Sequence, residues 1–147
     1  MNPPHIAIKR PIEVENIEKY EKILDKLAKS AKTFKIDIQG YSFFADKTFF
    51  LKVIKSKELM ILHNNLLSML KQQGIAPDNL EGDNQIFHIT LANNDISTKF
   101  VEILKKNYLP KKPLYNFPLK ELAILRYTST HWVIHKIVSI KQMTPQK

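Results

Sequence analysis

One short phrase occurs twice in the chain, as HIA at residues 5–7 and as HIT at residues 88–90. Three pairs of residues lie 83 positions apart in the sequence: His5 and His88, Phe34 and Phe117, and Phe49 and Trp132. A fixed internal period is typical of a fold built from copies of one unit. The chain is therefore expected to form two similar halves, each carrying one histidine motif.

Hydrophobic spacing predicts the same order of elements in each half. Alternating apolar residues indicate strands, and apolar residues three and four apart indicate helices. The expected strands cover residues 5–9, 33–44, 47–54, 86–92, 119–125 and 131–140, and the expected helices cover residues 14–32, 57–73 and 97–107. A proline-punctuated loop is expected at residues 109–118.

Chain length sets the domain organisation. A chain of 147 residues has the size of one domain. We expect a single α+β domain over residues 1–147, with a first lobe at about 1–73, a second at about 86–140, and the loop 74–85 between them.

Composition excludes some classes of function and leaves others open. The chain has no cysteine, which excludes disulfides and thiolate chemistry. It has no apolar run near the ~18 residues of a membrane span and no charged leader, so a cytoplasmic protein without a membrane partner is expected. A net charge of +9 favours polyanions such as RNA, although a solvated lysine-rich surface explains it equally well.

The repeated phrase also predicts a site. Residues i and i+2 of a strand share a face, so His5, Ala7 and Lys9 are expected on one face of the first strand. His88 and Thr90 share a face of the matching strand in the same way. Two opposed histidines suit transfer at phosphorus, one taking a proton from the attacking oxygen and the other giving one to the leaving oxygen. This chemistry requires no metal or cofactor.

The paired HIAIKRP and HITLA resemble the two His-x-Thr/Ser motifs of the 2H phosphoesterases, which include the bacterial 2′-5′ RNA ligase-like proteins and the cyclic phosphodiesterases. The resemblance continues through GYSFFADKTFFLKV and LAILRYTSTHWVIHKIVSI. It implies a bilobal, pseudo-symmetric α+β fold in which antiparallel sheets line a central cleft and helices lie outside. It also implies metal-independent action on 2′,3′-cyclic phosphates or 2′-5′ phosphodiester bonds of RNA or nucleotides. The resemblance assigns catalysis to His5 and His88 and phosphate binding to Thr90.

The chain departs from the family pattern in two ways. Ala7 stands where the family has Thr or Ser, and the lost hydrogen bond to phosphate is worth ~1.5–3 kcal/mol. Lys9 is expected to replace part of that phosphate contact, although a solvated lysine is an equal alternative. Members also carry a strand and a helix ahead of the first motif, which predicts here a smaller sheet, an edge covered by another subunit, or a chain trimmed at this end.

Two further interpretations stay open at this point. The chain is either a catalytically weakened or inactive RNA- or nucleotide-binding module of the same fold, or a basic scaffold in which the histidines are incidental. The natural substrate, the choice between hydrolysis and ligation, the acid and base roles of the two histidines, and the oligomeric state are left open by the sequence.

Overall fold

A computed structural model describes residues 2–93 and 96–141 of the chain. Three α-helices, one short 3-10 helix and six strands follow one another in the order α1 (Ile17–Ser30), β1 (Lys35–Phe44), β2 (Thr48–Val53), α2 (Lys57–Lys71), η1 (Gly82–Asn84), β3 (His88–Asn93), α3 (Thr98–Asn107), β4 (Leu114–Pro118), β5 (Glu121–Tyr127) and β6 (Trp132–Ser139). None of the helices in the described residues is long and apolar enough to cross a membrane.

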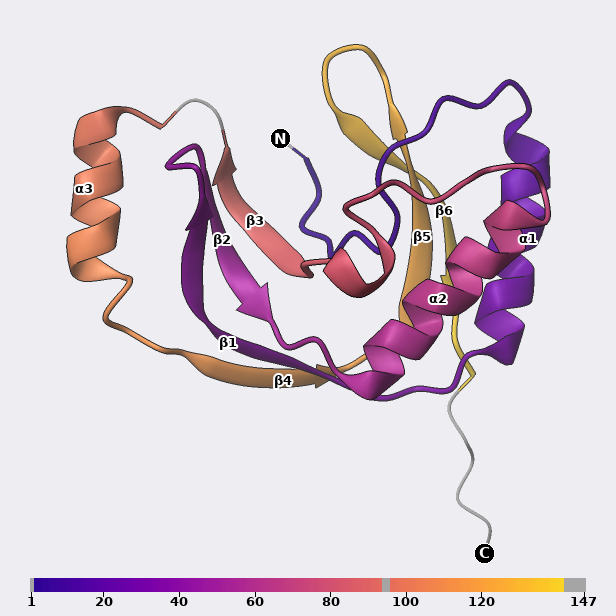
Figure 1. Ribbon diagram of the computed structural model, residues 1–147, viewed down its shortest axis with the longest axis horizontal. Helices are drawn as coiled ribbons and strands as arrows, with labels where there is room; N and C mark the ends of the chain where they lie inside the picture. Colours follow the sequence, from indigo (N-terminus) through magenta and orange to yellow (C-terminus); the bar gives the residue numbers. More distant parts are fainter. Residues whose placement is uncertain (1, 94–95, 142–147) are drawn as a thin grey trace, which may run out of the picture.

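The strands form two antiparallel sheets. Four strands pair in the order β3-β2-β1-β4, and β5 and β6 pair as a hairpin. The N-terminal segment runs between the curled four-stranded sheet and the hairpin (Figure 1). Strands from both halves of the sequence repeat share the larger sheet, and the lobe boundaries at 1–73 and 86–140 stay a prediction.

Helices cover the sheets from two ends of the molecule. α1 packs on α2 and on both strands of the hairpin, whereas α3 lies at the far end of the larger sheet (Figure 1). Each helix begins at a residue whose side-chain oxygen accepts an N–H of the first turn: Asn16 for α1, Ser56 for α2 and Ser97 for α3. These caps satisfy donors that the helix itself leaves free.

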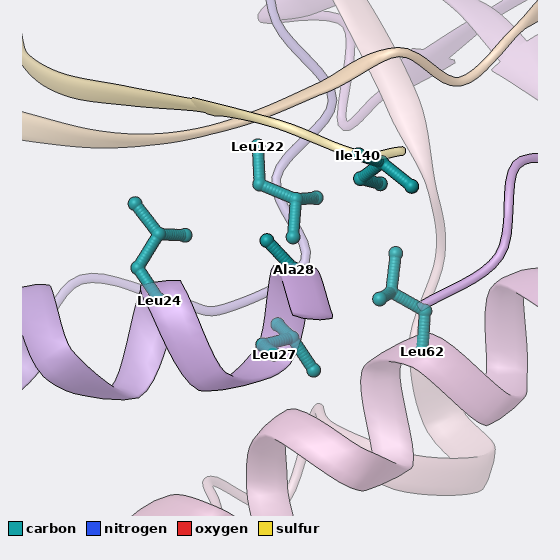
Figure 2. Packing of buried hydrophobic residues seen from close by; sticks show 6 residues of the cluster. All are labelled: Leu24, Leu27, Ala28, Leu62, Leu122 and Ile140. Carbon is teal, nitrogen blue, oxygen red and sulfur yellow. The ribbon is translucent and has the colours of Figure 1, made fainter. Parts of the chain in front are cut away.

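The apolar core has two adjoining parts. The first lies between α1, α2 and the hairpin, and Figure 2 shows its side chains pointing toward one another: Leu24, Leu27, Ala28, Leu62, Leu122 and Ile140. Burial of a side chain such as Leu27, which is 1% exposed, contributes ~1.5–3 kcal/mol. The second part lies against the larger sheet and includes Ile36, Leu59 and Phe87, with Ile6 and Ile89 packed on it.

Two element predictions were wrong. Residues 5–9 form no continuous strand: the chain bends at Ile8 and Lys9, and only Ile6 makes an isolated bridge, to Ile89. Residues 109–118 include β4, which pairs with the first half of β1 from Gln39↔Leu114 to Lys35↔Pro118. An edge strand tolerates proline at its ends because no partner needs the missing N–H there.

Candidate active site

The second histidine motif lies on β3. His88 stands opposite Lys52, and Thr90 stands opposite Phe50, both on β2. The His88 ring meets two aromatic rings on the same side of the sheet, Phe44 at 5.0 Å and Phe50 at 5.1 Å between centroids. Its Nδ1–H donates to the carbonyl of Ile86 at 3.3 Å.

The first motif holds its histidine in the same manner. Nδ1 of His5 lies 2.7 Å from the carbonyl oxygen of Pro3, again two residues earlier in the chain. A carbonyl oxygen only accepts, so the proton of a neutral ring lies on Nδ1 in both His5 and His88. Nε2 of each ring is then free to accept a proton, which is the arrangement that a general base requires.

The bridge between Ile6 and Ile89 brings the two motifs together. Antiparallel pairing at this point places His5 opposite Thr90 and Ala7 opposite His88, all on the face away from the apolar core. Residues diagonal to each other across such a pair have Cα atoms ~7–8 Å apart, within reach of imidazole side chains. The structure therefore collects His5, His88 and Thr90 at one place.

The electrostatics of the pair separate the two histidines. Burial lowers the pKa of His88 below its ordinary value, the bond to the Ile86 carbonyl opposes this, and a positive charge on nearby His5 lowers the pKa further. Because each lowering effect disfavours the imidazolium, His88 is held in the neutral form at pH values where an ordinary histidine is partly charged.

A large hollow adjoins the first motif. Its volume is about 810 Å³, and its lining includes residues 4–12. Residues 121–126 of β5, Trp132 and side chains of the apolar core also line it. Arg126 and Trp132 thus line the same space as His5.

The sequence matches a protein-family model over most of its length. A model described as the 2′-5′ RNA ligase superfamily matches residues 2–131. The chain belongs to the 2′-5′ RNA ligase superfamily. The resemblance to 2H phosphoesterases drawn from the two motifs is thereby confirmed.

Two solved structures have the same fold as this superfamily member. The crystal structure of TT0787 of Thermus thermophilus has a TM-score of 0.68 at 15% identity, covering 96% of this chain and 80% of that one. A crystal structure of a phosphoesterase has a TM-score of 0.65 at 18% identity, covering 95% of this chain and 78% of that one. At such identities the likeness is one of fold, and it confirms the predicted α+β fold class. No curated protein matches the chain.

Lys9 follows a bend and not a continuous strand, so strand alternation does not define its face. The Lys9 ammonium lies 2.8 and 3.0 Å from the two carboxylate oxygens of Glu81. The phosphate contact expected of Lys9 stays a prediction, and the ion pair gives this side chain a structural partner.

Other residues around the site carried only a weak signal in the sequence. Phe44 and Phe50 flank His88, yet phenylalanines in strands are ordinary core residues. Within residues 2–93 and 96–141, no three His, Cys, Asp or Glu side chains gather in a way that could hold a metal ion.

Proposed function

We propose that this superfamily member is a metal-independent phosphoesterase acting on 2′,3′-cyclic phosphate or 2′-5′ phosphodiester bonds of RNA or nucleotides. The observation that carries the proposal is the matched pair of histidines, each with Nδ1 bound to a carbonyl and Nε2 free, joined through the Ile6–Ile89 bridge. The net charge of +9 suits an anionic substrate.

The lowered pKa of His88 supports its role as the base. In hydrolysis of a cyclic phosphate, Nε2 of neutral His88 takes a proton from water as the water oxygen bonds to phosphorus. The bond from phosphorus to one ribose oxygen breaks, and that oxygen takes a proton from Nε2 of protonated His5. The Thr90 hydroxyl donates a hydrogen bond to a non-bridging oxygen, where charge increases in the transition state.

Ala7 favours a second candidate function. Its methyl group lies opposite His88 and offers no hydrogen bond, so one half of the symmetric phosphate site is missing. A nucleotide- or RNA-binding module that releases no product is the alternative that this residue supports. The two functions differ in turnover and agree in binding.

Turnover with defined substrates tests the proposal. The protein is incubated with nucleoside 2′,3′-cyclic phosphates or 2′-5′-linked oligonucleotides in the presence of chelator, and products are separated by chromatography. We expect slow hydrolysis that His5→Ala and His88→Ala each reduce by ~100-fold or more, because loss of a general acid or base costs 10²–10⁴-fold.

His135→Ala serves as the matched control. His135 lies on β6 and pairs with Glu21 of α1, so its loss is expected to leave turnover unchanged. Activity that chelator abolishes, or that survives both site substitutions, would exclude the proposed mechanism. Binding without product would leave the non-catalytic module.

A further inference from the structure

Residues 7–10 lie outside both sheets, yet several of their backbone groups have hydrogen-bond partners. Three buried side chains take the place of a neighbouring strand, and we call them the polar clamp: Gln85 Nε2 donates to the Ala7 carbonyl (3.4 Å), His63 Nδ1 donates to the Ile8 carbonyl (2.8 Å), and Glu81 Oε2 accepts from the Arg10 N–H (3.1 Å). The clamp therefore sets the path of the chain immediately after the first motif.

Glu81 is the charged member of the polar clamp. Its side chain is 0% exposed, and it accepts from the Lys9 ammonium and from the N–H of Asp78 at 2.8 Å. Burial raises the pKa of this carboxyl, but the hydrogen bonds from Lys9, Asp78 and Arg10 together outweigh burial and leave the pKa below its ordinary value. Glu81 is therefore ionised and anchors Lys9 and Arg10.

His63 joins three elements from inside the core. It is 0% exposed, its Nδ1 binds the Ile8 carbonyl, and its Nε2 accepts the N–H of Gly82 at 2.9 Å. The ring packs edge-on to Phe87 at 5.6 Å between centroids. Both ring nitrogens are thus occupied, so this histidine fixes α2, the first segment and η1 relative to one another.

The polar clamp is continuous with the second motif. Gln85 is followed directly by Ile86, whose carbonyl orients His88, so one stretch from Glu81 to His88 holds both histidine motifs. We propose that Glu81, His63 and Gln85 are positioning residues, which hold residues 7–10 so that His5 stays beside His88. The inference rests on the proposed function only for its kinetic consequence, because the placement of His5 is measurable without a substrate.

The test compares Glu81→Gln with the wild type. The amide keeps the shape of the side chain but presents N–H groups to donors and leaves the Lys9 ammonium without a counter-charge. NMR titration of the His88 ring responds to the presence of His5 beside it, since the His5 charge is, after burial, a further cause of the lowered pKa. We expect the His88 pKa to rise in Glu81→Gln, as in His5→Ala, and the double variant to show no further rise.

The kinetic readout separates positioning from binding. In Glu81→Gln we expect kcat to fall by ~10- to 100-fold, because a displacement of ~1 Å in a reacting group has an effect of this size. KM is expected to stay within about threefold, since Thr90 is not displaced. Asp83→Asn, an exposed carboxylate in the same loop, is the matched control and should change neither readout.

The two readouts keep the hypotheses apart. An unchanged His88 titration both in Glu81→Gln and in the variant that combines it with Lys9→Met, where the net charge is unchanged, would overturn the positioning role, whether or not the protein is active. A raised His88 pKa in Glu81→Gln, together with a wild-type protein that forms no product, would support the positioning role and exclude the enzymatic proposal. If Glu81→Gln does not fold, Lys9→Met combined with Glu81→Gln removes the ion pair without an unpaired charge, and the same rise is expected.

Discussion

Position 7 is where the two motifs differ, and its surroundings show how small the difference is. The Ala7 side chain lies opposite His88, while its carbonyl is held by Gln85. The backbone is therefore already fixed in the path that a serine would take. What is missing is one hydroxyl oxygen on the face that carries both imidazoles.

Ala7→Ser should restore that hydroxyl. If the chain is an enzyme weakened by this one loss, turnover should rise by ~tenfold or more, since ~1.4 kcal/mol of transition-state stabilisation gives a factor of ten. In a binding module, the same change should tighten nucleotide binding, measured by calorimetry, without product. If neither changes while Thr90→Ala abolishes both, the first motif does not contact phosphate.

At the residue level, the sequence predicted the paired groups but not their support. The repeated phrase indicates His5, His88 and Thr90 as candidates, because identical spacing is visible in one dimension, and their roles stay predictions. Glu81 and His63 contact the first segment across 72 and 55 positions, and no periodicity links them to it. The ion pair between Lys9 and Glu81 was not predicted for the same reason, because alternation along a strand does not reveal a bend in the backbone.

Among the elements, the helices and most strands were predicted well, whereas the strand at residues 5–9 and the proline-rich strand β4 were not. β1 and β2 agree with their predicted ranges within two residues, since alternation is strong there. β4 was taken for a loop because its prolines outweighed its apolar residues. β4 is a strand because it pairs with β1, and this tertiary contact is not visible in the local sequence.

A bulge at Gly40 divides β1 between its two neighbours. Gly40 has φ of 82°, and its N–H donates to the carbonyl of Pro113 at 3.0 Å. The register of β1 against β2 shifts between Ile38 and Tyr41, next to this glycine. A left-handed residue at this point lets β1 pair with β4 along one half and with β2 along the other.

Gly40→Ala should therefore destabilise the fold through its backbone alone. A Cβ at this position meets no atom within 4 Å, so the expected loss of ~1–2 kcal/mol in the free energy of unfolding comes from the left-handed conformation. Urea denaturation measures the loss, with Ser42→Ala on the same strand as the control. Equal midpoints for Gly40→Ala and the wild type would show that the strain is absent.

For the whole molecule, the fold is shared with proteins at 15% and 18% identity, although few residues are common. In the larger sheet, β3 and β4 of the second half flank β2 and β1 of the first half. The 83-residue period predicts equivalent positions in the two halves, and that relation stays a prediction. The shared sheet was not predictable, because a period does not specify which strands pair.

The unequal size of the two sheets has a consequence for amide hydrogen exchange. A hairpin of two strands is marginal by itself, and β5 borders the hollow of about 810 Å³ rather than a third strand of the described chain. Regions with fewer backbone partners open at a lower free energy than the global unfolding reaction. In deuterium oxide, amides of β5 should exchange through such local openings, whereas central β1 and β2 amides exchange only through global unfolding. Mass spectrometry of peptides covering residues 121–127 and 35–53 would measure this, and equal protection would mean that the molecule opens as one cooperative unit.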